Sequence, residues 1–338
     1  MRTSRKFVAA GLAAVLAAAI AGQALGWGAS GHRLVGQLAV ETLPAEIPGF
    51  LRSKKAVAAM GELAREPDRW KGGGKLHDAD REGAHFVDID DAGLVMGVMP
   101  LDDLKATRAD YESALQKAGT DGWKAGWLQY SIIDGYNQLI VDFRYWRVLT
   151  AMEKRAKGTQ KAWYKADRLR REQLILRDMG EFAHYVGDGS QPLHTSIHYN
   201  GWGDFPNPKG YSNDRLHGPF EGEFVARSVT LAGARAALPA PRDCACTIEQ
   251  RTVAYLTRTN ADTEPLYALW GEQAFKSNDP RAVAFATRHV AEGGAELRDM
   301  IVMAWRESAT GKIGWPAVAV EDVVAGKADP WQSLLGKD

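Results

Sequence analysis

Histidine and carboxylate residues recur four positions apart in the middle of the chain. His184 and Asp188 form one such pair, His217 and Glu221 form another, and His194 lies between them. On a helix, residues four apart project from the same face. Imidazole and carboxylate groups suit Zn²⁺, at about 2.0–2.2 Å from the ion. The joint pattern therefore predicts metal ligands, whereas a single pair of this kind is far more often a surface ion pair.

The residues around these pairs favour convergence on one point. Pro192 breaks the helical pattern that contains His184, so the chain can turn back and place His194 near Asp188. Pro219 separates the second pair and is tolerated only in the first turn of a helix. We therefore expect both pairs to contribute to a single metal centre.

The first 26 residues have the composition of a signal peptide. A positively charged start is followed by an alanine-rich apolar run at 7–25, and the small residues at 24 and 26 fit a signal-peptidase site. Cleavage before Trp27 leaves 338 − 26 = 312 residues, and the net charge falls from zero to −3 because Arg2, Arg5 and Lys6 are lost. The alternative is an uncleaved N-terminal anchor. We expect a secreted or periplasmic protein without stable membrane anchoring, whose free Trp27 amine can bind a metal.

Apolar residues recur every three or four positions over long segments, which predicts helices. Alternating β-branched stretches are scarce, so we expect an all-α fold in which residues 27–338 form a single compact multi-helix domain. Residues 85–89 alternate and could be extended, with no partner strand evident. Residues 72–74 and 200–213 are rich in turn-forming residues and predict loops. The expected helices cover residues 127–152, 169–186, 252–275 and 283–305.

Composition limits the classes of function. The 42 Lys and Arg residues balance the 42 Asp and Glu residues, so no general basic surface attracts nucleic acid or anionic membranes. A phosphate-bearing substrate must therefore be held locally. Cys244 and Cys246 are too few for a disulfide scaffold and lack the second pair of a thiolate zinc site. Oxidation to a disulfide, free thiols and intermolecular pairing all remain open for them.

Four motifs together resemble the nuclease S-one/P-one family, the single-strand-specific zinc nucleases related to the bacterial zinc-dependent phospholipases C. The resemblance extends from residue 27 to 221, and residues 290–297 faintly resemble the last helix of the family. The motifs are Trp27-x4-His32, His85-Phe86-Val87-Asp88, His184-x3-Asp188-x5-His194 and His217-x3-Glu221.

The resemblance implies three zinc ions and assigns their ligands. The aspartate of the first site is open, because Asp78 or Asp80 could replace Asp68. The third ion would be the most open to solvent. The implied ligands are Asp68, His85, His184 and Asp188 for the first ion; the amine and carbonyl of Trp27, His32 and a bridging Asp188 for the second; and His194, His217 and Glu221 for the third.

The resemblance also implies a mechanism in which a metal-bridging hydroxide attacks the phosphorus atom. Asp68 and Asp188 would act through the ions that they hold, and Lys71 would lie beside the scissile phosphate. Phe86, Tyr199 and Trp202 could stack on bases, or they could be core or acyl-chain contacts.

The expected function is a zinc-dependent endonuclease that hydrolyses RNA and single-stranded DNA to 5′-nucleotides, with no protein partner implied. One alternative is a phospholipase C acting on phosphatidylcholine-like lipids, because the glutamate at position 221 is the residue typical of those enzymes. A second alternative is a zinc-stabilised binding protein without turnover. We expect Asp88 to orient His85, with a surface carboxylate as the alternative. His77, His198 and His289 are expected to be surface or core histidines rather than ligands.

Overall fold

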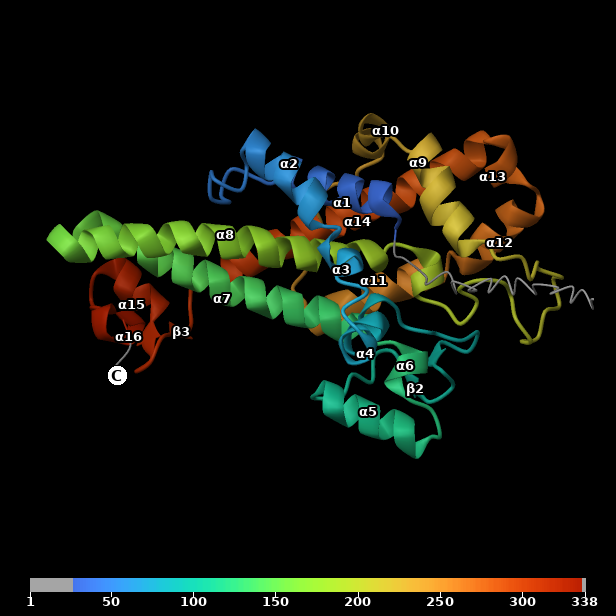
Figure 1. Cartoon of the computed structure of the whole chain (residues 1–338), viewed down its shortest axis with the longest axis horizontal. Coiled ribbons are helices and arrows are strands. Elements are labelled where there is room, and N and C mark those ends of the chain that lie inside the picture. Colours follow the sequence, from blue (N-terminus) through green and yellow to red (C-terminus); the bar gives the residue numbers. More distant parts are fainter. Residues whose placement is uncertain (1–26, 336–338) are drawn as a thin grey trace, which may run out of the picture.

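Two long helices form the axis of the molecule. The computed structural model describes residues 27–335, and the predicted signal peptide at 1–26 lies outside the described residues. Helices α7 (Leu128–Arg155) and α8 (Gly158–Asp188) are joined by residues 156 and 157 and pack against each other (Figure 1). The helices predicted at 127–152 and 169–186 are confirmed, and α8 begins earlier than expected.

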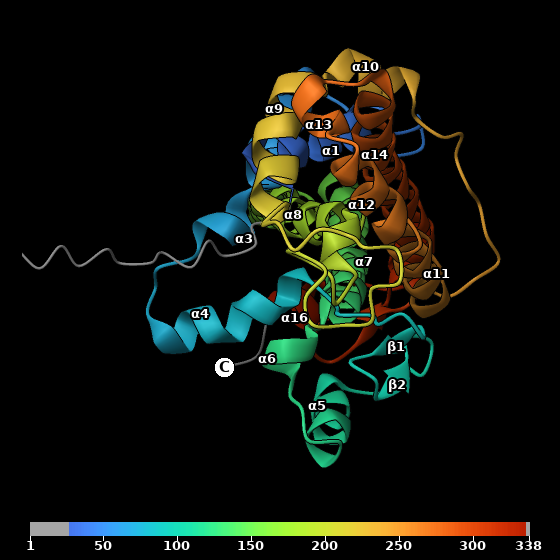
Figure 2. The ribbon, with the colours of Figure 1, turned by 90° about the vertical axis from the view of Figure 1, so that its right-hand side faces the viewer.

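Other helices cover this pair from two sides, as Figure 2 shows. On one side, α1 (Ala29–Glu41) packs on α2 (Lys54–Leu63), on α8 and on α14 (Pro280–Glu307), which confirms the helix predicted at 283–305. Close packing of α1 on α14 depends on Gly294, because a Cβ there would lie 2.9 Å from Cδ2 of Leu38. The opposite side carries α4 (Lys75–Glu82), α5 (Arg108–Lys117), α6 (Gly122–Ala125) and the hairpin of β1 (Leu94–Val95) and β2 (Met99–Pro100).

The extended segment that follows His85 does have partners. Val87 pairs with Gly126 in an antiparallel bridge, and Ile89 pairs with both Val95 and Ser196. These bridges join segments that are distant in sequence, which is why the alternation at 85–89 revealed the extended conformation but not its partners. They tie the segment after His85 to the segment after His194.

The expected single helix over 252–275 is wrong. The structure has three helices there: α11 (Ile248–Asn260), α12 (Thr263–Gly271) and α13 (Ala274–Ser277). Pro265 cannot donate a backbone hydrogen bond and its ring would clash with the carbonyl four residues earlier. It is therefore tolerated in the first turn of α12 but not inside a helix that continues from α11. Gln273 then adopts a left-handed conformation, with φ of 59°, which separates α12 from α13.

The all-α fold class is confirmed, since the sheets of the described residues are two short antiparallel hairpins. Every helix within residues 27–335 is too short or too polar to cross a membrane.

Cys244 and Cys246 form a disulfide with each other. The predicted loops at 72–74 and 200–213 contain no helix. The remaining elements are α3 (Glu66–Arg69), η1 (Gly83–His85), η2 (Pro192–His194), η3 (Pro219–Phe224), α9 (Val225–Ser228), α10 (Leu231–Ala236), β3 (Lys312–Ile313), β4 (Val318–Ala319), α15 (Val320–Ala325) and α16 (Trp331–Leu335).

Candidate metal centre

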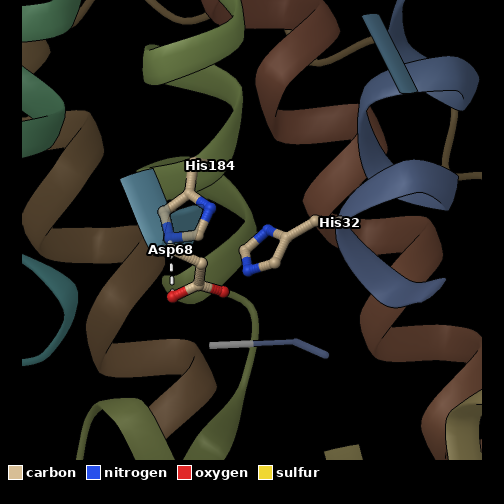
Figure 3. Close-up of side chains that lie close together, drawn as sticks. All are labelled: His32, Asp68 and His184. Carbon is tan, nitrogen blue, oxygen red and sulfur yellow. Dashed lines mark ion pairs between the residues drawn. The ribbon is translucent and has the colours of Figure 1, made fainter. Parts of the chain in front are cut away.

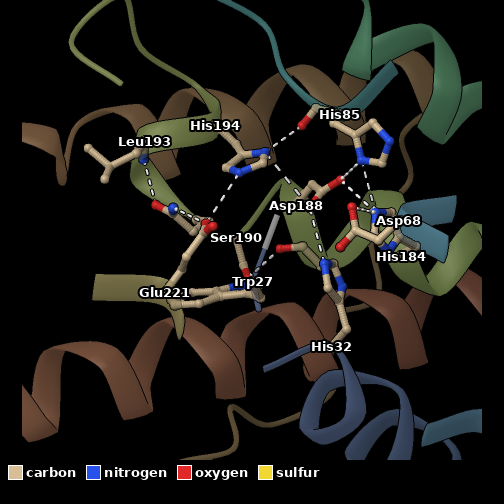
Figure 4. A network of polar contacts seen from close by, with 12 residues as sticks. Trp27, His32, Asp68, His85, His184, Asp188, Ser190, Leu193, His194 and Glu221 are labelled. Carbon is tan, nitrogen blue, oxygen red and sulfur yellow. Dashed lines mark hydrogen bonds and ion pairs between the residues drawn. The ribbon is translucent and has the colours of Figure 1, made fainter. Parts of the chain in front are cut away.

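Eight of the expected ligand side chains gather in one place, although they come from six separate parts of the chain (Figure 4). Seven of them are at most 3% exposed, and Asp68 is partly exposed. Burial of this many ionisable groups is unfavourable unless each has a partner. The contributions are His32 from α1, Asp68 from α3, His85 from η1, His184 and Asp188 from α8, His194 from η2, and His217 and Glu221 from the segment that leads into η3 and its first turn.

The end of α8 positions the central residues as the sequence predicts. The helix ends at Asp188, so His184 and Asp188 occupy its last turn and project from one face. Pro192 begins the short helix η2, and the Gln191 side chain accepts a hydrogen bond from the Leu193 amide, 2.7 Å away. This turn brings His194 back, so that its Nδ1 atom lies 3.8 Å from Asp188 Oδ1.

The first ligand group consists of His85, His184 and Asp188. Asp188 Oδ2 lies 3.0 Å from His85 Nδ1 and 3.3 Å from His184 Nε2. His184 Nδ1 lies 2.9 Å from the carbonyl oxygen of Ala64. Donation of the Nδ1 proton to that carbonyl leaves a lone pair on Nε2, which faces the group. This arrangement is typical of a metal-ligating histidine.

The second ligand group consists of His32, Asp68 and His184 (Figure 3). The rings of His32 and His184 stack with centroids 3.9 Å apart, and Asp68 Oδ1 lies 3.9 Å from His184 Nε2. Asp188 also faces this group, because its Oδ1 atom lies 3.4 Å from His32 Nε2. Neither ring nitrogen of His32 has a hydrogen-bond partner among the described residues. A metal ion would satisfy this buried imidazole.

The third ligand group consists of His194, His217 and Glu221. The Nε2 atoms of His194 and His217 lie 3.0 Å apart, and Glu221 Oε2 lies 2.7 Å from Nε2 of His217. His194 Nδ1 lies 2.6 Å from the carbonyl oxygen of His85. His217 Nδ1 lies 2.9 Å from the carbonyl oxygen of Tyr199. With both Nδ1 protons donated there, three lone pairs converge. Such an arrangement requires a cation or a shared proton between them.

Burial sets the protonation states of the centre. It lowers the pKa values of His184 and His217 to about 4, so both imidazoles are neutral near pH 7. Burial raises the pKa of Glu221 to about 8, so this carboxyl binds either a proton or a metal ion at neutral pH. Burial also acts to raise the pKa of Asp188, but the surrounding histidines, His184 foremost, outweigh it and hold that pKa well below the usual range. Neutral imidazoles and ionised carboxylates are the forms that bind metals.

The structure places Asp68, rather than Asp78 or Asp80, beside the histidines. Asp78 instead accepts hydrogen bonds from the amides of Gly72 and Gly73, and Asp80 lines a separate cleft. Lys71 Nζ donates to Asp68 Oδ1 over 3.1 Å. Lys71 therefore lies at the partly exposed edge of the second group, and its expected place beside a scissile phosphate stays a prediction.

Trp27 lies beside the centre and is fully buried. Its indole Nε1 donates to Ser190 Oγ over 2.6 Å, and its ring packs on Phe220 with centroids 5.6 Å apart. The residue before Trp27 and the predicted cleavage lie outside the described residues. The ligand role of the Trp27 amine therefore stays a prediction.

The three aromatic residues expected to stack on bases differ in exposure. Trp202 is only 2% exposed and stacks on His198 with centroids 3.7 Å apart, which favours the core alternative for Trp202. Tyr199 is 47% exposed, and its carbonyl oxygen faces His217. Phe86 is half-buried. Of the three, Tyr199 therefore offers the largest accessible side chain beside a ligand group.

The expected role of Asp88 is wrong. His85 faces Asp188, whereas Asp88 Oδ1 has no hydrogen-bond partner among residues 27–335. Asp88 belongs to the extended segment, whose backbone pairs with its neighbours and separates the two side chains. The residue that sequence reasoning missed is Gln191, whose amide donates to Glu221 Oε2 over 3.2 Å. Gln191 directly precedes η2, and only its neighbour Pro192 served as a turn signal in the sequence.

The remaining histidines do not belong to the ligand groups found among the described residues. His77 pairs with Asp78, His198 contacts Asp91 and the Trp202 carbonyl, and His289 is buried. No protein-family model, curated protein or solved structure matches this chain. Fold and site together define an all-α protein in which buried histidine and carboxylate groups could hold metal ions.

Proposed function

We propose that this protein is a zinc-dependent phosphodiesterase that hydrolyses RNA and single-stranded DNA to 5′-nucleotides, and that it belongs to the nuclease S-one/P-one family. The observation that carries the proposal is the position of Asp188, whose two oxygens face different histidines at 3.0–3.4 Å. A carboxylate in this position can bridge two cations. Paired cations about 3.5–4 Å apart are typical of sites that cleave phosphodiesters.

The donor set suits zinc. It combines imidazole nitrogens with carboxylate oxygens, the ligands that Zn²⁺ binds in catalytic sites. Asp68, His85, His184 and Asp188 would hold one ion, and His194, His217 and Glu221 would hold another. His32 and Asp188 would hold a third, together with the amine and carbonyl of a processed Trp27. Zinc ions in these places supply Lewis acidity toward phosphate oxygens and lower the pKa of water toward about 7.

The protein residues around the ligands orient them and hold the substrate. Backbone carbonyls fix the imidazole rings of His184, His194 and His217, so the ligand atoms need no reorganisation. Lys71 contacts Asp68 with one of its three ammonium protons, and the other two can donate to phosphate oxygens. Lys71 and Asp68 are 18% and 15% exposed, so this edge is the accessible side of a buried centre. We assign the scissile phosphate to this edge.

Local charge explains how a chain without net positive charge can bind a polyanion. Three Zn²⁺ ions would carry +6, against −3 from the ligand carboxylates Asp68, Asp188 and Glu221. Two unit charges 4 Å apart interact by about 4 kcal/mol at an effective dielectric constant of about 20. Tyr199 adds an exposed ring at which a base could stack, worth about 1–3 kcal/mol.

A parallel assay tests the proposal. Protein recovered after export, with Trp27 as its first residue and its zinc content measured, is incubated with denatured DNA and with phosphatidylcholine vesicles. We expect acid-soluble 5′-nucleotides from the DNA, with activity lost to a chelator and restored by zinc. Release of phosphocholine with intact DNA would establish a phospholipase C instead. Zinc binding without either product would indicate a zinc-stabilised binding protein.

A further inference from the structure

A large cleft lies beside the metal centre, between α4, the start of α5 and the helices α7 and α8. Its volume is about 930 Å³, within the range of about 300–1,000 Å³ that is common for small-molecule sites. Its lining residues are distinct from those of the three ligand groups. The cleft could therefore hold a part of a substrate other than the phosphate at the metal centre.

The cleft and the first ligand group share a wall. Tyr185 lines the cleft. Its ring makes edge contacts with the rings of His85 and His184, and the centroid distance is 5.6 Å in both cases. Arg81 also connects the two regions, because it lines the cleft and, with Lys71, a small adjacent hollow. A group attached to a phosphate at the Lys71 edge would therefore point toward the cleft.

The chemistry of the walls selects the kind of group. Three arginines and four carboxylates line the cleft, so it would repel a run of phosphates. Acyl chains are equally unsuited, because they would remove the charged groups of the walls from water. The walls also offer the aromatic ring of Trp70 and the exposed amides of Asn137 and Gln138. Flat aromatic faces together with amide donors and acceptors match a nucleobase, which has an apolar face and a polar edge.

We infer that this cleft binds a nucleoside of the substrate, with the base against Trp70 and Asn137 and the sugar toward Arg81. Trp70 is half-buried and directly precedes Lys71, so a base on its ring lies next to the edge assigned to the phosphate. The Arg177 guanidinium lies 5.8 Å from the centre of the Trp70 ring, within the range of a cation–π contact. This inference rests on the proposed function, because it takes the substrate to be a nucleic acid.

Calorimetric titration of the zinc-loaded protein with adenosine 5′-monophosphate and with inorganic phosphate tests this inference. We expect Trp70→Leu to weaken the binding of adenosine 5′-monophosphate about tenfold, the loss typical of one stacked base. The binding of inorganic phosphate and the zinc content should not change. The matched control is Trp123→Leu, which alters an exposed tryptophan of α6 that does not line the cleft. The control should bind both ligands like the wild type.

A second pair of variants covers the case in which Trp70→Leu fails to fold. Ala106 is exposed and lines the cleft, whereas Ala118 is exposed and does not. Ala106→Trp should obstruct the cleft and weaken nucleotide binding several-fold, and Ala118→Trp should leave it unchanged.

Equal nucleotide affinity in wild type, Trp70→Leu and Ala106→Trp would overturn the inference. It would also be overturned if the wild type bound adenosine 5′-monophosphate no more tightly than inorganic phosphate. Cleavage of single strands by a protein whose cleft variants bind normally would refute only the nucleoside site. Cleft-dependent nucleotide binding without cleavage of any nucleic acid would refute only the proposed activity.

Discussion

Asp188 Oδ1 lies 3.4 Å from His32 Nε2, and both side chains are fully buried. The other oxygen of Asp188 faces His85 and His184, so one carboxylate connects α1 with the segment at η1 and with the end of α8. This position predicts that Asp188 matters to more than one metal ion. Glu221 faces only the third ligand group and should matter to one ion.

Asp188→Asn should therefore be more harmful than Glu221→Gln. We expect Asp188→Asn to lose most of two zinc ions and nearly all activity, and Glu221→Gln to lose one ion. Both substitutions conserve side-chain shape, so folding is affected little. Metal analysis after gel filtration gives the stoichiometry. Equal zinc contents in the two variants would show that Asp188 does not bridge.

The N-terminus offers a second test. A version of the protein with one extra residue before Trp27 should lose the zinc ion at His32 and most of its activity, because a peptide nitrogen there cannot act as the amine ligand. One extra residue after Asp338 is the control and should change neither. Full zinc content in the N-terminally extended protein would show that the Trp27 amine is not a ligand.

His289 should make the fold sensitive to acid. Burial, assisted by the charge of Arg288, lowers the pKa of His289 to about 3, whereas an unfolded histidine titrates near 6.5. Between these values the unfolded chain binds a proton that the folded chain excludes. The free energy of unfolding is therefore undiminished by His289 above about pH 6.5. Below that pH it falls, by up to about 1.4 kcal/mol per pH unit. Urea denaturation of chelator-treated protein from pH 7 to 4 should give a shallower decline for His289→Leu. Parallel curves would contradict this prediction.

Gly126 should be essential for the position of His85. Its φ is +69°, and a Cβ atom there would lie 2.0 Å from the carbonyl oxygen of Phe86, the residue after His85. Gly126→Ala should reduce stability by about 3 kcal/mol or more, because strain and a backbone clash combine, and it should reduce zinc content. Gly119→Ala is a matched control with φ of +84° and open space around the Cβ. It should lower stability by only about 1 kcal/mol and leave zinc binding unchanged, as denaturation and metal analysis would reveal.

Local patterns predicted much of the site. The four-residue spacing of His184 and Asp188 is a property of one helix, and Pro192 directs the turn that returns His194. Tertiary choices were harder. Spacing alone could not decide between Asp68 and Asp78 as the ligand. What excludes Asp78 is that its carboxylate accepts hydrogen bonds from the amides of the glycine turn at 72–73.

The errors have similar causes. Proximity in sequence suggested that Asp88 orients His85, but the extended backbone between them separates the two side chains. The apolar period at 252–275 continued past Pro265, which is tolerated only in the first turn of a helix, so a new helix starts just before it. For Trp202 the sequence left stacking and core roles open, and its burial and its contacts with His198 and the surrounding loop favour the core.

Anomalous diffraction at the zinc absorption edge tests the central claim most directly. Crystals of the processed protein should show three peaks, one of them among His194, His217 and Glu221. The other two should lie about 3.5–4 Å apart, on either side of the Asp188 carboxylate. Crystals grown with zinc that show no peak at these histidines, or a single peak without contact to Asp188, would contradict it.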